Sequence, residues 1–193
     1  MKIVIASGNR HKIEEISAVL PGHLQLVPQT ELGVPSPEET GLTFVENAIL
    51  KARHAAAHTG LPALADDSGI EASALAGEPG IYSARYAGPD ASDTDNYVKL
   101  LAALEDQDDR SARFQSVIVY MRHEKDPTPV IATGTWPGTV LGEPEGDGGF
   151  GYDPVFRPDG YDVSVARLPA ELKNRISHRG LALASLSEQL DFL

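Results

Sequence analysis

The stretch Lys2-Ile3-Val4-Ile5-Ala6 is a short apolar run, and it is followed at once by the polar residues Ser7-Gly8-Asn9. Such a run predicts a buried strand. Asn9 is a favourable N-cap for the next segment, whose apolar positions 13, 16 and 20 share one face of a helix. This succession of strand, loop and helix is typical of an α/β protein.

Further strands and helices are predicted along the sequence. The strand candidates are residues 24–27, 63–65, 112–122 and 130–140. The helix candidates are 44–59, 92–104, a segment begun by Pro169, and a final helix with leucines at 183, 186, 190 and 193. Thr43 and Glu46 have the spacing of a capping box, while residues 34–41 are too rich in proline to be regular. No repeat or composition shift marks a boundary, so we expect one domain over residues 1–193.

Composition and charge restrict the function. The chain has 193 residues, 41% of them hydrophobic, and a net charge of -12. Such a negative charge disfavours a nucleic acid or an anionic membrane as a partner. The absence of cysteine excludes disulfides, thiolate zinc sites and cysteine nucleophiles, and it is consistent with a reducing compartment. No apolar run approaches the length of a membrane span or a signal-peptide core, so we expect a cytoplasmic protein.

The loop after the first strand is a candidate anion site. Backbone N–H groups at the start of a helix favour an anion. The loop also carries a hydroxyl, an amide and basic side chains, and its residues are Ser7, Gly8, Asn9, Arg10, His11 and Lys12. It is not the glycine-rich loop of P-loop proteins. The alternative is a capped helix whose basic residues are simply solvated.

Carboxylates form a second candidate group. Glu38-Glu39 lies in the proline-rich loop ahead of Lys51, and Asp66-Asp67-Ser68 follows the strand candidate 63–65. Ligands of α/β sheets collect beyond the carboxyl ends of strands, and carboxylate oxygens suit Mg²⁺. This predicts a role for Asp67, although solvated glutamates and an ordinary turn would give the same pattern.

Two later segments complete the set of candidates. In Gly148–Pro154, two aromatic residues stand within a glycine-rich stretch, which favours base stacking or else a buried turn. In Lys173–Arg179, basic residues gather in an acidic chain, as binding groups or as cations answering a helix dipole. Phosphate-binding cations, metal carboxylates and a stacking surface are together what a nucleotide phosphohydrolase needs.

Several motifs, in order along nearly the whole chain, resemble the inosine triphosphatase family, whose members remove deaminated purine nucleotides. They are Ser7-x-Asn9-x-x-Lys12-x-x-Glu15, Glu38 to Ala52, Ala65-Asp66-Asp67-Ser68-Gly69, Pro79 to Tyr86, Gly149-Phe150-Gly151-Tyr152-Asp153-Pro154 and Ser177-His178-Arg179-Gly180.

The resemblance implies an elongated two-lobed α/β fold, with a central mixed twisted sheet flanked by helices and an active-site cleft between the lobes. It also implies a homodimer, a need for Mg²⁺, and hydrolysis of XTP, ITP and dITP to the monophosphate and pyrophosphate. Such an enzyme cleanses the nucleotide pool and keeps deaminated bases out of DNA and RNA.

Individual roles carry over from the same resemblance. Residues Ser7 to Lys12 match the triphosphate cradle, and Lys51 and Ser68 match further phosphate contacts. Asp67 matches the general base and metal ligand, with Glu39 as a second ligand, although Glu38 is an alternative. The residues that match the base-binding region are Phe150, Gly151, Tyr152, Asp153, Lys173, His178 and Arg179.

Two departures from the family pattern and two rival functions remain. Arg167 stands where the family often has an acidic residue, and Leu172 stands where it has a glutamate before the lysine, which affects the positioning of Lys173. The role of Arg85 is open.

A pyrophosphatase of the septum-formation inhibitor type is disfavoured by the Phe150 and His178 motifs. A regulatory nucleotide-binding module without turnover is disfavoured by Asp67 and the lysines.

Overall fold

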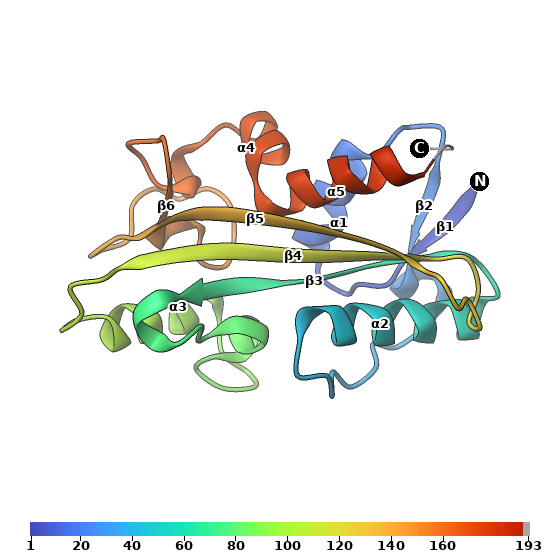
Figure 1. Cartoon of the computed structure of the whole chain (residues 1–193), viewed down its shortest axis with the longest axis horizontal. Helices are drawn as coiled ribbons and strands as arrows, with labels where there is room; N and C mark the ends of the chain where they lie inside the picture. Colours follow the sequence, from blue (N-terminus) through green and yellow to red (C-terminus); the bar gives the residue numbers. More distant parts are fainter. Residues whose placement is uncertain (191–193) are drawn as a thin grey trace. The chain divides into compact units, whose positions relative to one another are not determined.

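The computed structural model describes residues 1–190 of the chain. Six strands form one sheet in the order β2-β1-β3-β4-β5-β6. The strands are β1 (Lys2–Ile5), β2 (Gln25–Pro28), β3 (Ala63–Ala72), β4 (Ser111–Met121), β5 (Val130–Val140) and β6 (Phe156–Pro158). The helices are α1 (Arg10–Val19), α2 (Phe44–Thr59), α3 (Asp93–Ala103), α4 (Ala170–Ile176) and α5 (His178–Gln189), and Figure 1 labels all these elements.

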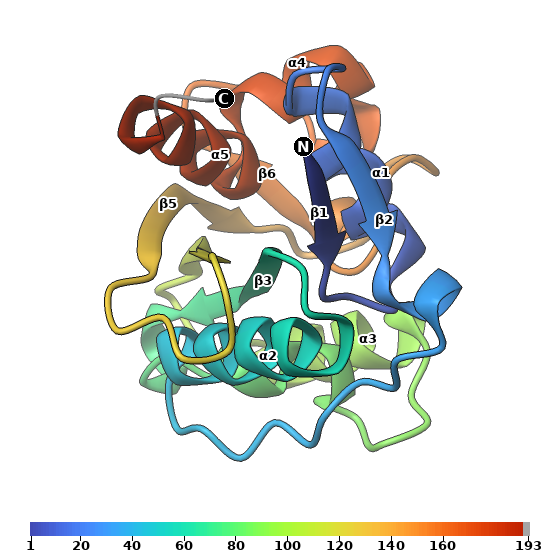
Figure 2. The ribbon, with the colours of Figure 1, turned by 90° about the vertical axis from the view of Figure 1, so that its right-hand side faces the viewer.

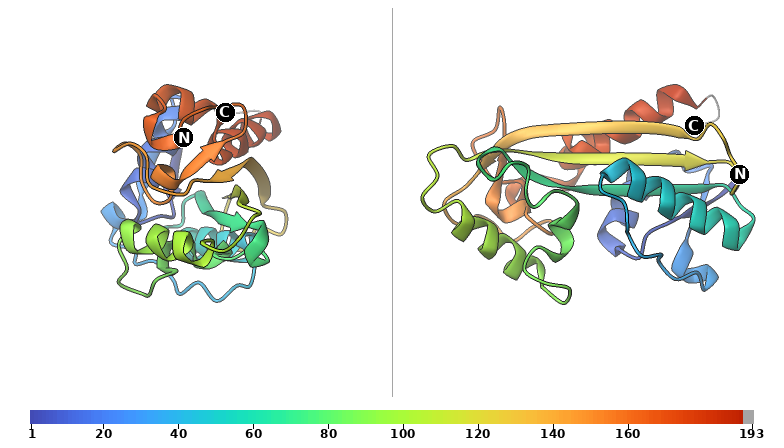
Figure 3. Two further views of the ribbon diagram at one scale, coloured as in Figure 1. Left: turned by 90° about the vertical axis from the view of Figure 1, so that its left-hand side faces the viewer. Right: turned by 60° about the horizontal axis from the view of Figure 1, so that its bottom comes forward.

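The sheet is mixed. Strand β1 is parallel to both β2 and β3, whereas β6 is antiparallel to β5. Strands β4 and β5 are neighbours along their length, as Figure 3 shows. The predicted α/β class, with a mixed sheet flanked by helices, is confirmed.

The described residues divide into two compact units. Within the described residues, unit 1 comprises residues 1–67, 116–134 and 178–190, and unit 2 comprises residues 68–115 and 135–177. Strands β3, β4 and β5 each contribute residues to both units.

In unit 1, helices cover both faces of the parallel strands (Figure 2). On one face, Ile3, Ile5 and Leu64 pack with residues of α1 and α5. On the other, Val4, Ala63 and Ala65 pack against the alanine-rich face of α2, which contributes residues 48, 52, 55 and 56. Alternate strand residues point to opposite faces, and this alternation decides where the charged residues of β3 go.

Unit 2 has its own core, built around three aromatic rings. Phe114 and Trp136 both meet Phe156 edge-on, at centroid distances of 4.8 and 5.8 Å. Leu100 and Leu104 of the α3 segment are buried in the same cluster, as the helical spacing of this segment predicts.

The predicted helix starts are confirmed. Asn9 caps α1 by accepting the Lys12 N–H, and Thr43 caps α2 by accepting the Glu46 N–H. Ser92 and Asp95 form a reciprocal capping box at α3. Leu193, which the leucine spacing places in the final helix, lies outside the described residues.

One predicted boundary is wrong. Strand β3 does not end at Ala65 but continues to Ala72, so Asp66 and Asp67 lie inside the strand rather than beyond its carboxyl end. Charged residues can occupy this buried strand because cations from other segments compensate them. The sequence pattern also missed β6 and short 3₁₀ turns such as Gly80–Arg85 and Asp153–Val155.

Candidate active site

Lys51 joins two carboxylates in unit 1. Its Nζ lies 2.6 Å from Asp67 Oδ1 and 2.9 Å from Glu39 Oε1, and it also donates to the Asp66 carbonyl oxygen at 2.9 Å. Lys51 lies on the buried face of α2, and both it and Asp67 are more than 90% buried. The sequence motifs at 39, 51 and 67 are therefore brought together by the fold.

Burial tunes this pair. Burial raises the pKa of the Asp67 carboxyl, against the opposing effect of Lys51 and Lys12. Burial lowers the pKa of Lys51, but the carboxylates of Asp67 and Glu39 outweigh it and hold that pKa above its ordinary value. Lys51 therefore stays an ammonium at neutral pH, and Asp67 is a stronger base than an exposed aspartate.

Asp66 is the centre of a second charged cluster. Its Oδ2 lies 2.9 Å from Lys12 Nζ and 3.2 Å from an Arg179 nitrogen, and its Oδ1 accepts the Ser116 hydroxyl at 2.6 Å. Arg179 also pairs with Glu15. Burial raises the pKa of Asp66, but Arg179, Lys12 and Ser116 together hold it well below its usual range. Burial lowers the pKa of Lys12.

The two aspartates serve different faces because they are neighbours in one strand. Asp66 meets Lys12 of α1 and Arg179 of α5, whereas Asp67 meets Lys51 of α2. Both lie beyond the carboxyl end of the adjacent parallel strand, because Ile5 at the end of β1 pairs with Leu64. The strand end at which the rule for α/β sheets would place a ligand is therefore that of β1 and not that of β3.

The loop that precedes α1 lies at this same edge. The Ser7 hydroxyl accepts the Asn9 N–H, and the Asn9 side chain accepts the Lys12 N–H, so both polar side chains shape the turn. Of the basic residues, Lys12 reaches Asp66, whereas exposed Arg10 pairs with Glu14 at 2.8 Å. His11 Nδ1 lies 3.9 Å from the same glutamate.

Unit 2 holds the second part of the predicted site. Lys173 Nζ lies 2.5 Å from Asp153 Oδ2 and 4.5 Å from the centroid of the Phe150 ring. Asp153 also accepts the Phe150 N–H at 2.8 Å. Gly149 has a φ of +74°, and a Cβ there would meet Asp153 Oδ2 at 2.1 Å. The missing side chain at Gly149 therefore lets the Asp153 carboxylate approach the backbone, where it accepts the Phe150 N–H and pairs with Lys173.

Other predicted residues are placed differently. Tyr152 is buried in the core of unit 2, where its hydroxyl donates to the Ser83 carbonyl and burial raises its pKa. Phe150 is the partly exposed aromatic of the two. Gly151 donates its N–H to Asp93. Ser68 belongs to unit 2, and His178 is a buried residue of unit 1.

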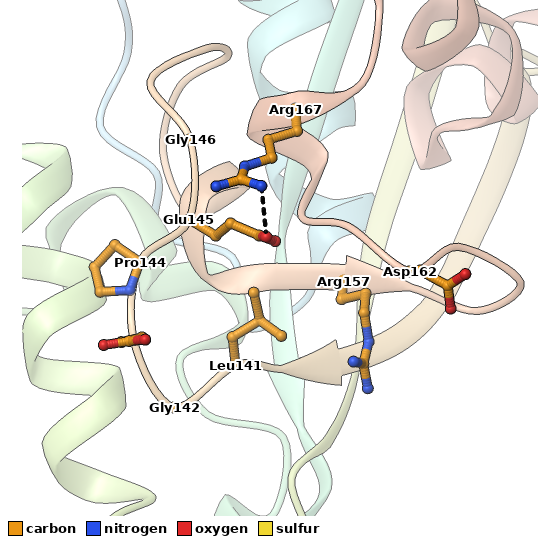
Figure 4. A pocket seen from close by; sticks show the side chains of 9 residues that line it. Leu141, Gly142, Pro144, Glu145, Gly146, Arg157, Asp162 and Arg167 are labelled. Carbon is orange, nitrogen blue, oxygen red and sulfur yellow. Dashed lines mark ion pairs between the residues drawn. The ribbon is translucent and has the colours of Figure 1, made fainter.

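A pocket of about 640 Å³ in unit 2 contains none of the predicted site residues (Figure 4). Residues 141–146 line it together with Arg157, Asp162 and Arg167. Arg167, one of the two departures from the family pattern, pairs there with Glu145 at 3.1 Å. This departure is thus accommodated by a local acidic partner.

The donor set is consistent with a metal held jointly with a ligand. Within residues 1–190, no group of three or more histidine or carboxylate side chains could hold a metal by itself. Mg²⁺ typically takes one or two carboxylates and completes its shell with substrate phosphates and water. Glu39 and Asp67, which share Lys51 Nζ, are such a pair.

Sequence reasoning gave Glu15 no individual role, although it belongs to the first motif, and it missed Ser116 and the structural role of Asp66. Their contacts join segments that are 50 to 164 residues apart. One pattern in the sequence could have indicated these contacts. Side chains alternate between the two faces of a strand, so two adjacent aspartates inside a buried strand need partners on both faces.

Two lysines paired with two buried aspartates beside a helix N-terminus, in an α/β fold, are typical of proteins that bind polyanionic ligands. The chain belongs to the Ham1 family, whose model matches residues 3–189. It is 56% identical to a dITP/XTP pyrophosphatase of Shigella flexneri, with 98% of each chain covered.

Solved structures agree with this assignment. A HAM1 protein from Coxiella burnetii is 50% identical to this chain. The alignment covers 100% of both chains, and the TM-score is 0.93. A nucleoside-triphosphatase, dITP/XTP pyrophosphatase, of Mycobacterium abscessus is 42% identical, with 97% and 99% of the chains covered and a TM-score of 0.76. The resemblance that the motifs indicate is confirmed.

Among residues 1–190, no helix combines the length and apolar character that crossing a membrane requires.

Proposed function

We propose that this chain hydrolyses XTP, ITP and dITP to the monophosphate and pyrophosphate with Mg²⁺ as its metal. The observation that carries the proposal is the placing of Lys12 and Lys51 on adjacent aspartates of β3, beside the N-terminus of α1. Two ammonium groups and a helix start at one edge suit a triphosphate. Family membership and the curated names of relatives support the same substrate class.

Asp67 is the residue that handles the proton. A water oxygen forms a bond to the α-phosphorus, the bond from that phosphorus to the bridging oxygen breaks, and pyrophosphate leaves. Asp67 accepts the proton of the attacking water, and its raised pKa suits it for this. Lys12 and Lys51 bind the phosphates and neutralise the charge of the transition state.

Glu39 and Asp67 would hold the metal. When bound, Mg²⁺ supplies further positive charge to the phosphate oxygens. For the base, we assign Phe150 as a stacking face for the purine, and Lys173, His178 and Arg179 as donors for its edge.

One assay tests the function against its rivals. Pyrophosphate release is measured from ITP, XTP, dTTP and ATP, with and without Mg²⁺. We expect release from ITP and XTP that depends on Mg²⁺. A preference for dTTP would favour the septum-formation inhibitor type, and binding without release would favour a regulatory module.

Removing either lysine should weaken catalysis on every base. We expect Lys12→Ala and Lys51→Ala each to lower kcat/KM by about tenfold to a hundredfold, which corresponds to about 1.5–3 kcal/mol for a hydrogen bond to a charged group. The kcat/KM values for ITP, XTP and dITP are compared with those of the parent. A loss confined to one base would place that lysine at the purine instead.

Arg179 should govern the choice of base. Hypoxanthine and xanthine present an acceptor oxygen at C6, whereas adenine presents an amino donor, so ATP is expected to be a poor substrate. We expect Arg179→Ala to narrow the ratio of ITP to ATP efficiency by about tenfold to a hundredfold.

Arg179→Lys keeps a cation for Glu15 and Asp66 but removes the guanidinium group. It therefore distinguishes a loss of base recognition from a loss of folding. An unchanged ITP-to-ATP ratio in both variants would leave Arg179 with a structural role only.

We further propose that the enzyme is a homodimer and that it acts in the cytoplasm. Its partner is a small nucleotide, and neither a nucleic acid nor a membrane. The net charge of -12 and the absence of cysteine support this setting. Sedimentation of the purified chain measures its mass, and a monomer at working concentration would contradict the dimer.

A further inference from the structure

We propose that Asn47 is a positioning residue that fixes the loop carrying Glu39 against the first turn of α2. The inference rests on the proposed function, in which Glu39 helps to hold the metal. It assigns a role to a side chain that lies apart from the charged cluster.

Asn47 is used for its carbonyl oxygen. The residue is 0% exposed, and its Oδ1 accepts the Gly41 N–H at 2.8 Å. Its Nδ2, also buried, has no hydrogen-bond partner among the described residues. An unsatisfied buried donor is destabilising. An apolar residue at position 47 would avoid the cost of this unsatisfied donor. The use of asparagine is therefore explained by the bond that its Oδ1 makes to Gly41, two residues after Glu39.

The loop is fitted closely to this turn of the helix. A Cβ at Gly41 would lie 2.6 Å from Glu46 Cβ and 2.7 Å from Asn47 Oδ1. Glu46 adds a bond to the next residue of the loop, since its carboxylate accepts the Leu42 N–H at 2.9 Å. Two successive helix residues thus hold two successive backbone N–H groups.

Asn47 and Lys51 act on the same loop from one face of α2. Residues four apart on a helix are neighbours, and both are buried. Lys51 reaches the Glu39 carboxylate, but it divides its donors between Glu39, Asp67 and the Asp66 carbonyl. The backbone near Glu39 therefore needs its own attachment, which Asn47 provides.

Helix α3 offers a matched control. Asn96 follows the Ser92 capping box as Asn47 follows Thr43 and Glu46, and it is 2% exposed. Its Oδ1 accepts the Ala87 N–H at 2.8 Å, and its Nδ2 donates to the Ala84 carbonyl. This is the same attachment of a preceding loop, but it lies in unit 2 and holds no proposed metal ligand.

The test compares Asn47→Leu with Asn96→Leu. Amide hydrogen exchange is followed in peptides covering residues 36–44 and 84–88, and the Mg²⁺ concentration for half-maximal XTP hydrolysis is measured. We expect Asn47→Leu to speed exchange in 36–44 and to raise the Mg²⁺ requirement about tenfold or more, as for other residues that orient a metal ligand. Asn96→Leu should speed exchange in 84–88 and leave the Mg²⁺ requirement unchanged.

Two further variants keep the test decisive. Asn47→Asp retains the acceptor and should restore slow exchange in 36–44. Gly41→Ala leaves the helix sequence unchanged but separates the loop from it, because the added Cβ would collide with Glu46 and Asn47. It should reproduce both effects of Asn47→Leu if that variant does not fold. Unchanged exchange, or an unchanged Mg²⁺ requirement in an active variant, would overturn the proposal. A parent without XTP hydrolysis would overturn the proposed function instead, and exchange alone would then decide the attachment.

Discussion

Asp67→Asn is expected to lower kcat on XTP by about 10²–10⁴-fold, the usual contribution of a general base. The amide cannot accept the proton of water. It also removes a negative charge from the pair of carboxylates around Lys51. Substrate binding should decline much less, because Lys12 and Lys51 remain as cations for the phosphates.

The measurement is single-turnover hydrolysis of XTP together with the Kd for the nucleotide. Asp126→Asn is a matched control, since Asp126 is a buried aspartate of the same unit whose partner Arg122 lies outside the proposed site. It should retain the parental rate. Near-parental turnover of Asp67→Asn would remove both the base and the metal assignment from this residue.

Asp66→Asn is expected to lower the free energy of unfolding by about 3–5 kcal/mol, the cost of removing one partner from a buried ion pair. Lys12 and Arg179 would lose their shared carboxylate, while Ser116 would keep an acceptor. Urea unfolding at pH 7 measures the loss. A loss no larger than that of Asp126→Asn would contradict the central place of Asp66.

The pH dependence of the parent's free energy of unfolding also tests whether Asp66 stabilises the fold through its ion pairs. The pKa of Asp66 is lower in the folded chain than in the unfolded chain, where it is about 3.9. The unfolded state therefore binds more protons in acid, so the stabilisation is fully present well above pH 4 and is lost as the pH falls below it. Asp66→Asn should flatten this acidic limb, and an equally steep limb would count against the assignment.

Local signals predicted the ends of helices well. Asn9 and Thr43 cap the helices that they were expected to cap, because a cap depends on residues within one turn. The charged pairs on either side of β3 depend instead on residues brought from α1, α2 and α5. No local pattern contains that information.

The error at Asp66 and Asp67 has the same cause. Two adjacent aspartates after an apolar run normally indicate the end of a strand, because a buried charge is costly without a partner. Here each carboxylate has its own cation, so the strand continues to Ala72. Tyr152 illustrates the converse, since an aromatic in a glycine-rich stretch proves to be a core residue whose hydroxyl is satisfied by Ser83.

The central claim is that water attacks the α-phosphorus of a deaminated purine triphosphate. Hydrolysis of XTP in ¹⁸O-labelled water, with mass spectrometry of both products, tests it most directly. We expect one labelled oxygen in the xanthosine monophosphate and none in the pyrophosphate. Label in the pyrophosphate, or release of single phosphate instead, would place the attack on another phosphorus and contradict the account.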